Sequence, residues 1–147
     1  MHRTFLFLST AVIFVAAGTA VAHNEEEQLG GETVRVISTR DIQEKIDGKD
    51  SAETVVEVTI PPGKEGVAHR HPGPGFVYVL EGEYELGIDD QPTKRFKAGE
   101  TFYEPTGCLH RVSRNPSDKT RTRLIAVVLH PRGVTEIAVP EHPQGAH

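Results

Sequence analysis

The sequence has little that would crosslink the chain or give it a basic surface. Cys108 is the only cysteine in 147 residues, so no internal disulfide can form and the fold must depend on its core. The chain has 16 Lys and Arg against 21 Asp and Glu, which gives a net charge of -5. This mildly acidic balance argues against a general nucleic-acid-binding protein, which would show a basic patch and a high pI. It also argues against an anionic membrane surface as the partner.

Long apolar runs are scarce, and the one present lies at the N-terminus. Residues 5–17 are almost all apolar, Arg3 precedes them, and Ala20-Val21-Ala22 is a small-x-small cleavage site. The run is shorter than the roughly 20 apolar residues that a membrane-spanning helix needs. We therefore expect residues 1–22 to be a cleaved signal peptide and residues 23–31 to be a flexible leader. The protein is then expected to be periplasmic or secreted, with no membrane contact after cleavage.

A sustained helical period is also lacking after the N-terminal run, although residues 41–46 could form one helical turn. Short segments rich in β-branched and aromatic residues recur instead, separated by Gly, Pro and Asp. They are residues 54–60, 76–80, 84–88, 101–103, 110–113 and 123–129. Many short strands in a chain long enough for one domain predict an all-β sandwich or barrel. We expect this domain to span residues 32–140, with a flexible tail at 141–147.

The first pattern with chemical meaning is His69-Arg70-His71. Side chains at i and i+2 of a strand project from the same face, so the two imidazoles could converge on one metal ion. The chain has 8 histidines, and chance alone gives about 0.4 such pairs. Taken alone, the pair fits two metal ligands or two solvated histidines at a strand edge.

The surrounding residues narrow this choice. Gly63, His69, His71 and Gly82 form one block, and Gly99, Pro105, Gly107 and His110 form a second. Together the two blocks, spanning about residues 63–115, resemble the two motifs of the cupin family. The resemblance implies a single-domain jelly-roll β-barrel in which His69, His71 and His110 bind one divalent transition metal (Fe, Zn, Ni, Mn or Cu). It also implies a homodimer, and exposed strand edges such as residues 54–60 would be suited to pairing.

Two positions depart from the cupin motifs. The usual glutamate ligand would stand at position 75, where this chain has Gly75. The asparagine that often follows four residues after the last histidine would stand at Arg114, and Asn115 comes one residue later. The first departure changes the chemistry, whereas the second is expected to affect only a turn.

Glu104 is the candidate substitute for the missing carboxylate. Strand alternation places Glu104 on the same face as Phe102. If that face is the barrel interior, Glu104 could be an additional metal ligand or a catalytic base. If it is not, Glu104 is a solvated carboxylate at the barrel rim.

The walls of the site follow from the same alternation. Val77 and Val79 share the strand face of position 75, so we expect them, with Phe102, to line an apolar pocket beside the metal. Such a pocket favours a small organic ligand, and no Gly-rich phosphate loop or Lys/Arg cluster accompanies the motifs. Tyr78 and Tyr103 are expected in the core or at a subunit contact. Cys108 is expected to be a small buried thiol, and His130 is expected at the surface.

Three functions fit this pattern. Some cupin dioxygenases for diketones, thiols and aromatic acids use three histidines without the glutamate, so the resemblance favours a small-molecule dioxygenase. The alternatives are a non-catalytic module that binds or senses a metal or small ligand, and a metal-dependent isomerase or hydrolase. The last would use metal-bound water, with only Glu104 available as its acid or base. Fold alone does not decide among them.

Overall fold

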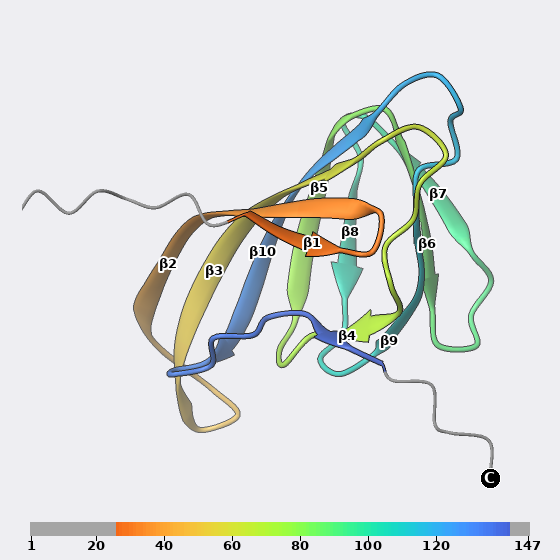
Figure 1. The fold of residues 1–147 in the computed structure, drawn as a ribbon. Coiled ribbons are helices and arrows are strands. Elements are labelled where there is room, and N and C mark those ends of the chain that lie inside the picture. Colours follow the sequence, from red (N-terminus) through yellow and green to blue (C-terminus); the bar gives the residue numbers. More distant parts are fainter. Residues whose placement is uncertain (1–25, 142–147) are drawn as a thin grey trace, which may run out of the picture.

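The computed structural model describes residues 26–141, which form two antiparallel β-sheets (Figure 1). The strands are β1 Glu26–Leu29, β2 Glu32–Ile46, β3 Lys49–Ile60, β4 His69–Arg70, β5 Gly75–Glu81, β6 Glu83–Ile88, β7 Lys94–Lys97, β8 Thr101–Glu104, β9 Leu109–Arg114, β10 Thr122–Pro131 and β11 Val139–Pro140. One sheet has the order β1-β2-β3-β10-β5-β8 and the other β11-β4-β9-β6-β7. The all-β prediction is confirmed. The part of the chain described contains no helix long and apolar enough to cross a membrane.

The core lies between the two sheets and follows the strand alternation. In β5, Val77 and Val79 are buried, whereas Phe76, Tyr78 and Leu80 are exposed. Leu124, Ala126 and Val128 of β10 are buried in the same way, and Leu124 and Ala126 belong to one core cluster with Tyr84 and Leu86 of the opposite sheet. The alternation read from the sequence is therefore confirmed for β5. Tyr78 and Tyr103 do not lie in the core, because their side chains are exposed on the outer face.

The N-terminal part of the domain differs from the sequence-based expectation. Residues 26–29, expected in a flexible leader, form β1 and pair with β2 across the turn at Gly30-Gly31. Residues 41–46, expected as a helical turn, continue β2 and pair with β3. Both segments are polar, and they adopt β-structure because partner strands satisfy their backbone hydrogen bonds. Residues 1–25 and 142–147, including the expected signal peptide and most of the tail, lie outside the described residues.

The predicted pairing edge is also wrong. Residues 54–60 lie in β3, and β3 is hydrogen-bonded to β2 on one side and to β10 on the other. Strand order cannot be read from a single strand, and the long β2 covers what would otherwise be an edge. The edge strands of this sheet are β1 and β8.

Gly82 makes the turn between β5 and β6, as the resemblance implied. Its φ is 77°, in the region that disfavours other residues. A Cβ at this position would also lie 2.4 Å from the carbonyl oxygen of Arg121. The turn therefore requires glycine for two reasons.

Candidate metal centre

The three predicted histidines come together between the sheets. His69 of β4 and His110 of β9 are direct partners in the strand register, and His71 follows β4 immediately. The ring centroids are 4.9 Å apart for His69 and His71, and 4.7 Å apart for each of the other two pairs. The ligand atoms of the three side chains lie within 4.8 Å of one another. Tetrahedral nitrogen ligands around zinc lie about 3.3 Å apart, so small ring movements would let these three hold an ion.

Two of the rings are oriented by backbone carbonyls. Nδ1 of His69 donates a hydrogen bond of 2.9 Å to the carbonyl oxygen of Val67. Nδ1 of His71 donates to the carbonyl oxygen of Ile137, which belongs to the segment between β10 and β11. A second ring N–H held by a carbonyl is the usual arrangement of a metal-binding histidine, because it fixes the tautomer and leaves Nε2 free to bind.

The third ring carries an unsatisfied atom. His110 is 1% exposed, and its Nε2 is buried without a hydrogen-bond partner among the described residues. Buried polar atoms in proteins nearly always have a partner. Burial lowers the pKa of His110 to about 2 and that of His69 to about 4, and also lowers that of His71. The three rings are therefore neutral at pH 7 and offer lone pairs, so the residues fit a divalent transition metal.

Glu104 lies beside these rings and not at the barrel rim. It ends β8 and is 3% exposed. Its Oε2 lies 3.5 Å from Nε2 of His71, and its Oε1 lies 3.7 Å from Nδ1 of His110. Burial, together with the charge of Glu32, raises the pKa of Glu104 to about 8. Because burial makes ionisation of this carboxyl group unfavourable, a cation beside it would stabilise its charged form.

The position of Glu104 is linked to the glycine that replaces the family's ligand. Gly75 of β5 is the register partner of Glu104 in β8. A Cβ built on Gly75 would lie 2.5 Å from Oε2 of Glu104 and 3.3 Å from its Cβ. The carboxylate of Glu104 therefore occupies space that a side chain at position 75 would need.

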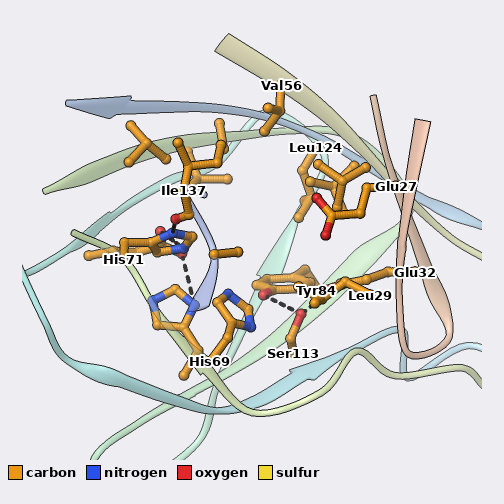
Figure 2. Close-up of a pocket in the computed structure, with 18 residues that line it drawn as sticks. Glu27, Leu29, Glu32, Val56, His69, His71, Tyr84, Ser113, Leu124 and Ile137 are labelled. Atoms are coloured by element: carbon orange, nitrogen blue, oxygen red, sulfur yellow. Dashed lines mark hydrogen bonds and ion pairs between the residues drawn. The ribbon is translucent and has the colours of Figure 1, made fainter. Parts of the chain in front are cut away.

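An apolar cavity of about 60 Å³ adjoins the site (Figure 2). Its walls include Val77, as predicted, together with side chains of β2, β3 and β10. Val79 and Phe102 do not line the cavity, contrary to the prediction. Val79 is fully buried in the core, and Phe102 lies behind Tyr84, whose ring stacks on it at 5.4 Å. The cavity thus ends at the Tyr84 ring.

Sequence reasoning missed a second polar group in the cavity wall. Tyr84 donates a 2.9 Å hydrogen bond to Ser113, and Ser113 donates one of 2.9 Å to Oε2 of Glu32. Burial raises the pKa of Glu32 to about 7, and the bond from Ser113 opposes that rise. No motif marks these residues, because Glu32 and Ser113 are 81 positions apart in the sequence. They meet only because the start of β2 packs against β9 in the fold.

Two other predictions concern residues outside the site. His130 is buried, not at the surface, because its Nε2 and Oγ1 of Thr54 are 2.9 Å apart and its Nδ1 bonds the carbonyl of Pro131. Cys108 is buried as expected, and burial raises the pKa of its thiol to about 11.

The displaced asparagine has a structural explanation. β6 and β9 pair with a register shift in which Arg111 is an extra residue, so Asn115 follows one position later than in the motif. Asn115 is buried, and its amide donates to the carbonyls of Ile60, Pro61 and Thr120. It therefore ties the end of β3 to the loop that follows β9, which is more than the turn role expected.

Comparisons with known proteins agree with this geometry. The family model of the cupin domain matches residues 56–128. The chain contains a cupin domain. No curated protein matches the chain in sequence. The matched range contains His69, His71 and His110.

Solved structures show the same fold. An oxalate decarboxylase variant from Bacillus subtilis superimposes with a TM-score of 0.59 at 15% identity, over 82% of this chain and 31% of that one. An RmlC-like cupin from Shewanella frigidimarina superimposes with a TM-score of 0.54 at 22% identity, over 80% of this chain and 95% of that one. This chain thus spans less than a third of the decarboxylase and almost the whole length of the second cupin.

Proposed function

We propose that this cupin is an exported protein that binds one divalent transition metal through His69, His71 and His110 and acts on a small organic molecule as a dioxygenase. The observation that carries the proposal is the convergence of three neutral imidazoles beside an apolar cavity, one of them with an unsatisfied buried nitrogen. Iron, zinc, nickel, manganese and copper all suit such ligands. The Mn(II) centres of Bacillus subtilis oxalate decarboxylase support manganese as a member of this set.

Different groups of the chain would position the metal ligands and exclude water from the site. The backbone carbonyls of Val67 and Ile137 hold two rings in the binding tautomer. When bound, the ion would supply open coordination positions for substrate oxygen atoms and O₂. The apolar walls would exclude water, which strengthens the electrostatic interactions in the site.

Glu104 has two candidate roles at this centre. As an additional ligand it would offset one of the two positive charges that neutral imidazoles leave uncompensated. As a base it would accept a substrate proton at Oε2, the oxygen nearest Nε2 of His71. Its burial and its distances to two rings support either role.

The test begins with protein purified from the periplasm or the culture medium. N-terminal sequencing is expected to start at His23, and elemental analysis is expected to find one equivalent of a transition metal. O₂ uptake is then measured with a panel of enols, flavonols and diketones, with His110→Ala as the metal-free control. O₂ uptake by the native protein but not by His110→Ala supports the dioxygenase.

Two other results would favour the alternatives. A metal-loaded protein that retains a small ligand without turnover would indicate a binding or sensing module. Conversion of a substrate without O₂ uptake would indicate an isomerase or hydrolase. A chain that takes up no transition metal would contradict the dioxygenase and the metal-dependent isomerase or hydrolase, and would leave only a module that binds a small ligand.

A further inference from the structure

The cavity has a second polar end, formed by Tyr84, Ser113 and Glu32. Figure 2 shows His69 and His71 at one end and these three side chains toward the other. The walls between are mostly apolar and include Val56 and Leu124. A ligand bound at the metal would therefore meet a second set of hydrogen-bonding groups at its far end.

The hydrogen-bond directions define what this end can bind. Tyr84 gives its proton to Ser113, and Ser113 gives its proton to Glu32. Burial raises the pKa of Tyr84 well above its ordinary value, so its hydroxyl stays protonated and keeps donating along this chain. Its oxygen then has only lone pairs to offer a ligand. A matching ligand group must be a hydrogen-bond donor.

The charge of the lining adds a second restriction. Three glutamates line the cavity, Glu27, Glu32 and Glu104, and its lining in residues 26–141 includes no Lys or Arg. An anionic group at the far end would lie near Glu27 and Glu32, with no Lys or Arg of the lining to balance its charge. A hydroxyl group or an ammonium group meets no such penalty.

We propose that Tyr84, Ser113 and Glu32 form a second binding pole that selects a hydroxyl or ammonium group on a small ligand whose other end binds the metal. The second pole rests on the proposed function, because it assumes a metal-bound end. It deepens that function by excluding ligands that carry a carboxylate at the far end.

The experiment uses small thiols that share one metal-binding end. The full chain is loaded anaerobically with Co²⁺ and titrated with 2-mercaptoethanol, cysteamine, 3-mercaptopropionate and 1-propanethiol, with 3-mercapto-1-propanol as a longer hydroxyl probe. The thiolate-to-cobalt absorption band reports binding without any catalytic step. Each titration is repeated with Tyr84→Phe and Glu32→Gln. The control is Glu85→Gln, because Glu85 of β6 is also buried but pairs with Arg95 and Arg114.

The variants are expected to change the affinity only of the probes that end in a hydroxyl or ammonium group. One lost hydrogen bond corresponds to about fivefold in affinity for a neutral group and tenfold or more for a charged one. Tyr84→Phe should therefore weaken the hydroxyl probes about fivefold, and Glu32→Gln should weaken cysteamine about tenfold. Neither change should alter propanethiol binding, and mercaptopropionate should bind the wild type more weakly than cysteamine does.

Two outcomes separate this inference from the function on which it rests. If Tyr84→Phe and Glu32→Gln change the affinity of every probe by the same factor, the second pole is overturned and the metal site stands. A chain that takes up no Co²⁺, or that shows no thiolate band, overturns the metal site and the two-ended ligand together.

Discussion

Exchanging residues 75 and 104 tests whether Glu104 replaces the carboxylate ligand that cupins usually carry on β5. The two residues are register partners on neighbouring strands, and a Cβ on Gly75 would reach the Glu104 carboxylate. If the carboxylate has moved across the strand pair, Gly75→Glu combined with Glu104→Gly should return it to the same place. Glycine is used at position 104 because Cβ atoms at both positions would be only 3.3 Å apart.

The single variants set the scale. Removing one partner of a buried charge pair costs about 3 kcal/mol, or roughly 100-fold in a binding constant. Glu104→Gly should therefore weaken metal binding about 100-fold without unfolding the protein. Gly75→Glu alone should destabilise the fold by about 3 kcal/mol or more, because it places two carboxylates in one buried site with a 2.5 Å contact.

The double variant should recover metal affinity to within about tenfold of wild type. Competition titration of Co²⁺ against a chromophoric chelator measures the affinity, and thermal unfolding of the apo-protein checks that each variant is folded. Gly75→Gln with Glu104→Gly has nearly the same shape without the charge and should not recover. The reasoning is refuted if Glu104→Gly binds metal as tightly as wild type, or if the folded double variant stays as weak as the single one.

Three further predictions address the pH response, the metal and the oligomer. Because the pKa of Glu32 rises to about 7 on folding from 4.5, the folded apo-protein holds a proton that the unfolded chain releases. Stability should fall by up to about 3 kcal/mol as pH rises from 4.5 to 7, and urea titrations of Glu32→Gln should show a flatter profile; equal profiles would contradict this. A metal present at 1,000 times its dissociation constant should add about 4 kcal/mol to stability, visible as a higher Tm that His110→Ala abolishes. Phe76, Tyr78, Leu80 and Tyr103 form an exposed apolar face beside the edge strand β8. This face is expected to pair two copies, so Tyr103→Glu should convert a dimer to a monomer in sedimentation experiments, and a monomeric wild type would refute it.

The convergence of the three histidines was predictable because their signal is local. His69 and His71 are two residues apart, and the fixed spacing of Pro105, Gly107 and His110 marks the turn that delivers the third ring. The interior position of Glu104 followed conditionally from its alternation with Phe102, since one buried residue fixes the face of a strand.

The predictions that failed depend on contacts between distant segments. His130 is buried because its ring hydrogen-bonds to Thr54, which lies 76 positions away in the sequence. The polar stretch that contains Glu27 and Leu29 becomes a strand only because β2 folds back on it. Single-strand alternation gives the face of a residue but not the depth of the cavity, and so it assigned Val79 and Phe102 to the lining.

The pairing of Gly75 and Glu104 also shows how a carboxylate can reach this site although the motif position carries none. Directly opposed residues in an antiparallel pair point to the same side of the sheet, and a Cβ at position 75 would lie only 3.3 Å from that of Glu104. Either residue can therefore direct a flexible side chain such as glutamate to one point, provided that the other is small. A glycine at the motif position leaves room for a carboxylate on the neighbouring strand, because any larger side chain at position 75 would displace Glu104. It follows that for such sites the informative unit is the pair of opposed residues, which a one-strand motif does not contain.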